Sequence, residues 1–241
     1  MAQTPLQPTV YRAGMKPSRE VGISPLPVSR RGLVAAVAGA TAASLAGCSL
    51  LEDDEIARSA SPAAVDSATM EATQFDHDGT SELTGTRTVE VAGESRELRL
   101  TNYLAAYRKT VPAVEGAVAT VQLFSTPSVR IAGQEANPFA SFDTRRLLSE
   151  ILSLAGEEGF EGVEEVGSRR SSVLGAQRTF TLHETTARRQ GLDIDISLPV
   201  ARFTHDGDVL GVFAAYPKLV GENAGVYEAT EGVVHPAKNA G

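Results

Sequence analysis

The sequence predicts one α+β domain over residues 86–241, in which helices flank a curved antiparallel β-sheet. Several segments alternate apolar and polar residues, as strands with one buried face do. Residues 144–155 repeat apolar residues at helical spacing, and a weaker helical pattern follows the last strand. This order of elements favours helices packed on one sheet, and 42% hydrophobic residues in a chain of 241 is enough for a packed core.

The first strands are expected to form a hairpin. Residues 86–91 alternate apolar and polar side chains, Gly93-Glu94-Ser95 has turn composition, and the apolar positions resume at residues 98–103. Residues 117–124 then have the composition of a buried strand, and a short strand follows at residues 129–131.

The clearest helix is expected to begin at about Thr144. Asp143 can cap its first amides, Phe142 can pack on Leu147, and Gly156 can end the helix. The apolar face of this helix consists of Leu147, Leu148, Ile151, Leu152 and Leu154.

Two strands joined by a tight turn are expected near the carboxyl terminus. Residues 192–200 alternate apolar with polar side chains, so one face of this strand is expected to contact the core and the other to contact water. Asp206-Gly207 favours a two-residue type I′ turn into a second apolar strand at residues 209–216. The tail, residues 222–234, has the pattern of a weaker helix.

The first 47 residues have the features of an export signal. Ser29-Arg30-Arg31-Gly32-Leu33-Val34 resembles a twin-arginine signal, and a moderately apolar, Ala-rich stretch follows. That stretch ends in Leu45-Ala46-Gly47-Cys48, which resembles a lipobox, the motif that directs lipid attachment to its cysteine. We therefore expect a twin-arginine translocase to act on residues 1–47, and a lipid on Cys48 to hold the protein on the extracytoplasmic face of the cell membrane.

Two alternatives concern this signal. No charged residue lies between Gly32 and Leu51, a length that spans a bilayer as a helix, so an uncleaved anchor would place the rest of the chain on the same side. The start codon is either Met1 or Met15, and neither choice alters the expected location at the outer face of the membrane.

Residues 48–85 are expected to form a flexible tether. This segment is rich in Ala, Ser, Thr, Asp and Glu, and it includes the acidic run Glu52-Asp53-Asp54-Glu55. Its later part, residues 75–79, has an alternative place in the folded domain.

The charge of the chain is strongly negative. The formal net charge is −8, and removal of residues 1–47 leaves 17 basic and 29 acidic residues, a net charge of −12. Such a surface repels nucleic acid, and with only four lysines it is typical of salt-adapted archaeal proteins, whose self-repulsion is screened at molar salt. An ordinary acidic protein of a bacterium with a GC-rich genome is the alternative.

No catalytic, metal or cofactor motif is predicted. His205-Asp206-Gly207-Asp208 contains metal-ligand residue types, but a hairpin turn accounts for the same residues. Asp76-His77-Asp78 could also bind a cation, but we interpret it as an acidic surface loop. The segment Arg169-Arg170-Ser171-Ser172 is interpreted as a solvated loop rather than as an anion site.

Five short motifs carry a resemblance to a family. The chain resembles haloarchaeal lipoproteins of unknown function, in which the following pieces recur in order between about Val118 and His235: Thr126-Pro127, Asn137-Pro138, Leu174-Gly175, Asp206-Gly207-Asp208 and Tyr216-Pro217. More distantly, the order of elements is similar to that of PsbP-like exported domains, a likeness of shape that transfers no site.

Two functional classes remain open at this point. The first is a non-catalytic envelope module that binds a small ligand or another surface protein, and it is favoured because no convergent titratable groups are recognisable. The alternative is a cell-surface enzyme, such as a hydrolase, whose site is assembled from scattered residues.

We predict that Cys48→Ser permits export but releases the protein from the membrane fraction, because the attached lipid supplies most of the anchoring free energy. Fractionation of cells into membrane and soluble parts measures this. A Cys48→Ser protein that stays fully membrane-bound would instead favour the uncleaved helix.

Overall fold

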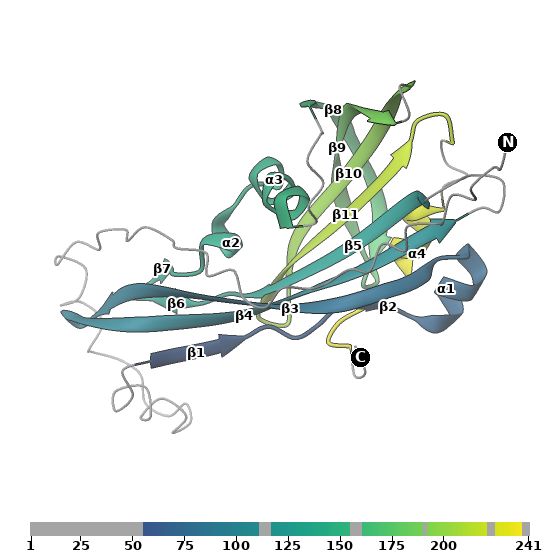
Figure 1. Ribbon diagram of the computed structural model, residues 1–241. Helices are drawn as coiled ribbons and strands as arrows, with labels where there is room; N and C mark the ends of the chain where they lie inside the picture. The colour runs from purple at the N-terminus through teal and green to yellow at the C-terminus, as the bar shows by residue number, and fades with distance from the viewer. Residues whose placement is uncertain (1–54, 111–116, 155–160, 190–191, 221–224, 238–241) are drawn as a thin grey trace, which may run out of the picture.

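The computed structural model describes residues 55–110, 117–154, 161–189, 192–220 and 225–237 (Figure 1). The predicted export and lipidation residues lie outside the described residues, as does Gly156. They are Arg30, Arg31, Leu45, Ala46, Gly47 and Cys48.

One eight-stranded sheet dominates the structure, with the strand order β1-β4-β5-β11-β10-β9-β8 and with β3 also paired to β4. All of its pairs are antiparallel except β1 with β4, which are parallel. Its strands are β1 (Glu55–Ser59), β3 (Asp76–Val91), β4 (Glu94–Thr110), β5 (Ala117–Pro127), β8 (Glu161–Val173), β9 (Ala176–Arg189), β10 (Leu192–His205) and β11 (Asp208–Pro217).

Four short helices and two small sheets complete the part of the chain that the structure describes. The helices are α1 (Ser67–Thr73), α2 (Pro138–Ser141), α3 (Thr144–Leu154) and α4 (Val226–Glu231). One small sheet pairs β2 (Ala64–Val65) with β12 (Val233–Val234), and the other pairs β6 (Arg130–Ile131) with β7 (Gln134–Glu135). The predicted antiparallel sheet with helices on it is therefore present, but the domain is mainly β rather than a balanced α+β fold.

The predicted tether is wrong from residue 55 onwards. Residues 55–85 contain β1, β2, α1 and the first half of β3. β3 is an edge strand in which only Arg87 and Val89 are buried, and such strands are polar because little of their surface enters the core. In residues 76–85, the polar composition that suggested a tether is that of an edge strand.

Both predicted hairpins are confirmed, but Glu94 and Ser95, which were expected in the first turn, belong to β4. β3 and β4 pair along nearly their whole length around a turn at Ala92-Gly93. β10 and β11 are joined by Asp206 (φ 48°) and Gly207 (φ 85°), and positive φ at both central positions is what a type I′ turn requires.

Helix α3 matches its prediction. The Asp143 carboxylate accepts a hydrogen bond from the Arg146 amide at 2.8 Å, and the Asp143 carbonyl accepts one from the Leu147 amide. Phe142 and Leu147 belong to the same apolar cluster, as the expected contact requires. The tail prediction is correct in part, since α4 occupies only residues 226–231 and β12 follows it.

Strands β5 and β11 and the second half of β10 are buried on both faces. In residues 192–200 the predicted alternation holds at first, where Asp193 and Asp195 are exposed, and it ends at the buried Pro199. Leu198 and Val200 pack in the cluster beneath α3, whereas Ala201 packs in the cluster on the opposite face. We call these the α3 face and the α4 face of the sheet, because α3 contacts β10 on one face whereas α4 packs among the residues of the opposite cluster. Pro199 and Ala201 lie where the alternation of apolar and polar residues stops, so the sequence pattern gives no signal for the burial of this second face.

The α4 face is covered by segments from both ends of the described chain. Val65 pairs with Val233, and the Asp66 amide donates to the Gly232 carbonyl at 2.9 Å. The Val65 amide donates to the Tyr107 hydroxyl at 3.0 Å, and burial raises the pKa of this phenol. Asp66 also caps α1, and the Thr69 amide that donates to its carboxylate lowers the pKa of Asp66.

Two of the sequence motifs meet in one buried hydrogen-bond chain. The Asn137 side-chain amide donates to the Thr126 hydroxyl at 2.6 Å, and that hydroxyl donates to the Asn102 side-chain carbonyl at 2.5 Å. Asn137 also donates to the Pro127 carbonyl, while its own side-chain oxygen accepts from the Phe139 amide and so caps α2. This chain fixes the start of the α2–α3 segment to β5 and β4.

We predict that Asn137→Ala lowers the free energy of unfolding by about 2–3 kcal/mol, because it leaves buried polar partners unsatisfied. The matched control is Asp143→Ala, which removes an exposed helix cap worth about 1 kcal/mol. Denaturant titration of both variants measures the difference, and equal losses would show that the buried chain contributes nothing beyond a cap.

Candidate functional site

A pocket lies between α3 and the sheet on the α3 face. Its volume is about 250 Å³, and it is bounded by side chains of α3, β5, β9, β10 and β11. The lining residues are Ala117, Val118, Ala119, Thr120, Gln122, Leu148, Ile151, Leu152, Ala187, Ile194, Ile196, Leu198, Phe213, Ala214, Ala215, Tyr216 and Pro217.

The pocket arises from how α3 rests on the sheet. At Gly211 a Cβ atom would lie 2.7 Å from the Phe213 ring and 3.0 Å from the Leu147 side chain, so the glycine leaves room for these two side chains beneath α3. Farther along the same face the sheet presents the small side chains of Ala187 and Ala215 opposite the helix. The small residues leave the space that the larger helix side chains do not fill.

The lining is chemically simple. No Asp, Glu, Lys, Arg, His or Cys belongs to the described residues that line the pocket, and its polar groups are Thr120, Gln122 and Tyr216. Such a lining suits an uncharged, mainly apolar molecule that makes few hydrogen bonds.

A buried histidine lies next to this pocket. His183 on β9 is paired with the pocket residue Leu198 on β10, so the two side chains share the α3 face. Its exposed fraction is only 1%, and neither ring nitrogen has a hydrogen-bond partner. His183 is therefore a buried polar group beside a mainly apolar pocket.

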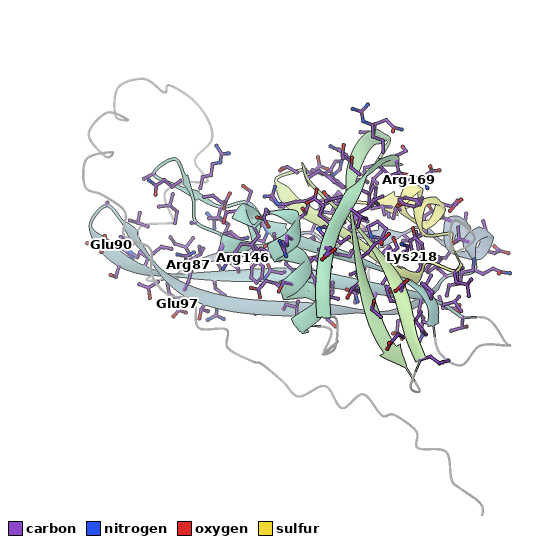
Figure 2. All side chains as sticks on the ribbon, turned by 90° about the horizontal axis from the view of Figure 1, so that it is seen from above. Arg87, Glu90, Glu97, Arg146, Arg169 and Lys218 are labelled. Carbon is purple, nitrogen blue, oxygen red and sulfur yellow. The ribbon has the colours of Figure 1, made fainter. Side chains whose placement is uncertain are left out.

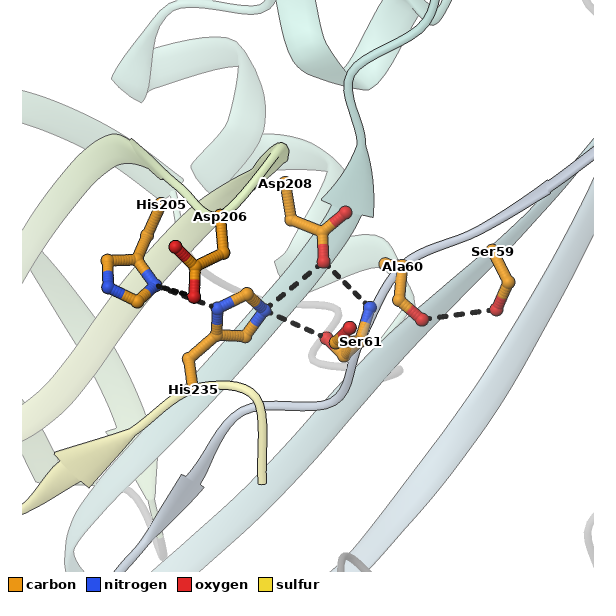
Figure 3. A network of polar contacts seen from close by, with 7 residues as sticks. All are labelled: Ser59, Ala60, Ser61, His205, Asp206, Asp208 and His235. Carbon is orange, nitrogen blue, oxygen red and sulfur yellow. Dashed lines mark hydrogen bonds and ion pairs between the residues drawn. The ribbon is translucent and has the colours of Figure 1, made fainter. Parts of the chain in front are cut away.

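A second group of polar side chains gathers at the β10–β11 turn, and we call it the histidine cluster: His205, Asp206, Asp208 and His235, with the backbone of Ser61 (Figure 3). The Nδ1 atoms of His205 and His235 are 3.0 Å apart, and Nδ1 of His205 is 3.7 Å from the Asp206 carboxylate. Nε2 of His235 is 3.2 Å from both the Asp208 carboxylate and the Ser61 carbonyl. The predicted turn is thus present, but its side chains also meet a histidine 30 residues away in sequence.

The other polar motifs of the sequence form no such group. His77 lies at the start of β3, where it contacts the Thr80 hydroxyl at 3.0 Å, and the neighbouring Asp78 forms an ion pair with Arg108. The predicted loop at residues 169–172 is wrong, because these residues belong to β8. The Arg169 guanidinium lies 4.0 Å from the centre of the Tyr227 ring on α4 (Figure 2).

Two parts of these sites were not foreseen from the sequence. His235 was missed because a lone histidine before a proline carries no motif, and only the β2–β12 pairing brings it to the turn. The pocket was missed because alanines and aliphatic residues have the same appearance whether a core is filled or hollow.

The comparison with protein families matches most of the part of the chain that the structure describes. Residues 62–234 match the family described as a domain of unknown function (DUF6517). The chain belongs to this family. The matched region begins just before β2 and ends with β12, so it includes the pairing of the two terminal segments. No curated protein matches the chain.

No helix among the described residues is both long and apolar enough to cross a membrane.

Proposed function

We propose that this protein is a lipid-anchored, extracytoplasmic binding module that takes a small, uncharged and mainly apolar molecule in the pocket beneath α3. The observation that carries this proposal is the pocket of about 250 Å³ with an apolar lining. A filled core would leave no such space, since protein interiors pack to nearly uniform density.

The composition of the lining favours binding over catalysis. An acid–base or nucleophilic site needs titratable or nucleophilic side chains that converge on the substrate. The described lining of this pocket offers a threonine, a glutamine and a tyrosine among apolar residues. The alternative, a cell-surface enzyme, therefore finds no support in this pocket.

The cellular location in this proposal rests on the sequence alone. Arg30 and Arg31 precede an apolar stretch that ends in the lipobox at Cys48, which supports export and lipid attachment. The acidic surface and the resemblance to haloarchaeal lipoproteins support a salt-adapted cell envelope, and the likeness to curved PsbP-like domains supports a role as an exported module.

The neutral fluorophore N-phenylnaphthylamine tests the pocket. We expect its fluorescence to rise saturably on addition of the protein in molar salt, and Ala215→Met to weaken its affinity at least tenfold, a change of about 1.4 kcal/mol. The longer side chain would fill the pocket on its sheet side.

The matched control places the same substitution on a surface away from the pocket. Ala72 is exposed on α1, so Ala72→Met should leave probe affinity unchanged. No saturable binding by the unaltered protein, or equal affinity for the Ala215→Met variant, would contradict the proposal.

A further inference from the structure

We propose that His205, Asp206 and His235 bind a divalent transition-metal ion such as Zn²⁺, and that this ion joins the carboxyl-terminal segment to the β10–β11 turn. One ligand atom from each of these residues lies within 4.8 Å of the other two. The site is separate from the pocket, with which it shares no residue.

The hydrogen bonds of His235 determine which of its nitrogens is available to a metal. Its Nε2 faces the Asp208 carboxylate and the Ser61 carbonyl, and both of these groups are acceptors. Nε2 therefore carries the hydrogen and donates it, so in the neutral ring the lone pair is on Nδ1. That atom is the one that faces His205.

This arrangement is the one that metal-binding histidines use. A ligating imidazole usually donates its other N–H to a carboxylate or a backbone carbonyl, which fixes the ring orientation and increases its basicity. Here Asp208 fills that role, and its carboxylate is itself held by the Ser61 amide at 2.7 Å. The side chain of His235 is fully buried and that of Asp208 is 9% exposed, so the support lies inside the protein.

The donor set indicates the class of metal. Two imidazoles and one carboxylate suit Zn²⁺ and its neighbours better than Ca²⁺ or Mg²⁺, which prefer oxygen ligands. Two nitrogens bound to tetrahedral Zn²⁺ lie about 3.4 Å apart, so the 3.0 Å separation needs only a small opening. The exposed Asp206 side of the cluster leaves a fourth position for water.

The charge balance at the cluster also favours a cation. Two carboxylates, Asp206 and Asp208, lie beside two histidines, and no Lys or Arg forms an ion pair with either carboxylate among the described interactions. A bound dication would neutralise the charge of these two carboxylates.

Without a metal, the two histidine rings are joined by a direct hydrogen bond between their Nδ1 atoms.

The test is isothermal titration of metal-free, untagged full-length protein with Zn²⁺ alone, in molar salt. All samples carry Cys48→Ser, so that no thiolate competes for the metal. We expect one Zn²⁺ per chain and an affinity at least tenfold weaker in His205→Asn and His235→Asn. Asp208→Asn, which alters only the group that positions His235, is also expected to weaken binding about tenfold or more.

Two variants keep the test decisive. Asp206→Asn preserves the turn, since asparagine tolerates positive φ, and it removes only the carboxylate ligand, so its affinity should fall in a folded protein. His77→Asn removes an imidazole outside the cluster and should bind Zn²⁺ as the parent does. Absence of stoichiometric binding by the parent, or parental affinity in both His205→Asn and Asp206→Asn, would overturn the proposal and leave the direct histidine hydrogen bond.

Discussion

The burial of β5, β11 and the second half of β10 on both faces is the constraint on which the rest of the structure depends. Val121, Val212 and Ala201 pack on the α4 face, whereas Phe124 and Phe213 pack on the α3 face. Because an apolar face left in water would cost much of the hydrophobic free energy of folding, each face requires its own cover. The chain supplies these covers from different segments: α2 and α3 for one face, and both terminal segments for the other.

The segments that cover the α3 face leave a pocket, whereas those that cover the α4 face bring distant side chains together. Each candidate site lies at one of these two covers. The Leu147 side chain of α3 packs on the sheet at Gly211, but the helix leaves a pocket over Ala187 and Ala215. On the opposite face, the pairing of β2 with β12 brings His235 to the β10–β11 turn. The pocket beneath α3 and the histidine cluster therefore both result from the way the two faces of one sheet are covered, and they share no residue.

The sequence predicted the elements with strong local signals. The α3 helix has a cap at Asp143 and an apolar face, and the turn at Asp206-Gly207 has a residue pair that favours positive φ. Residues 76–85 of β3 and the whole of β8 were missed, because strands at an edge need no apolar alternation. The histidine cluster depends on a contact across 30 residues, and the pocket depends on how side chains fill space, so neither has a local signal.

Thermal melting of a chain that ends at Gly225 tests most directly whether the carboxyl-terminal segment is an essential cover. This truncation removes the buried side chains of Val226, Tyr227, Ala229 and Val233, and the loss of their burial costs more than about 5 kcal/mol, a large share of the stability of an ordinary domain. We expect the truncated chain to lose its cooperative transition or to melt at a much lower temperature than the full chain. A melting temperature within a few degrees of that of the full chain would contradict the account, because the α4 face would then be stable without its cover.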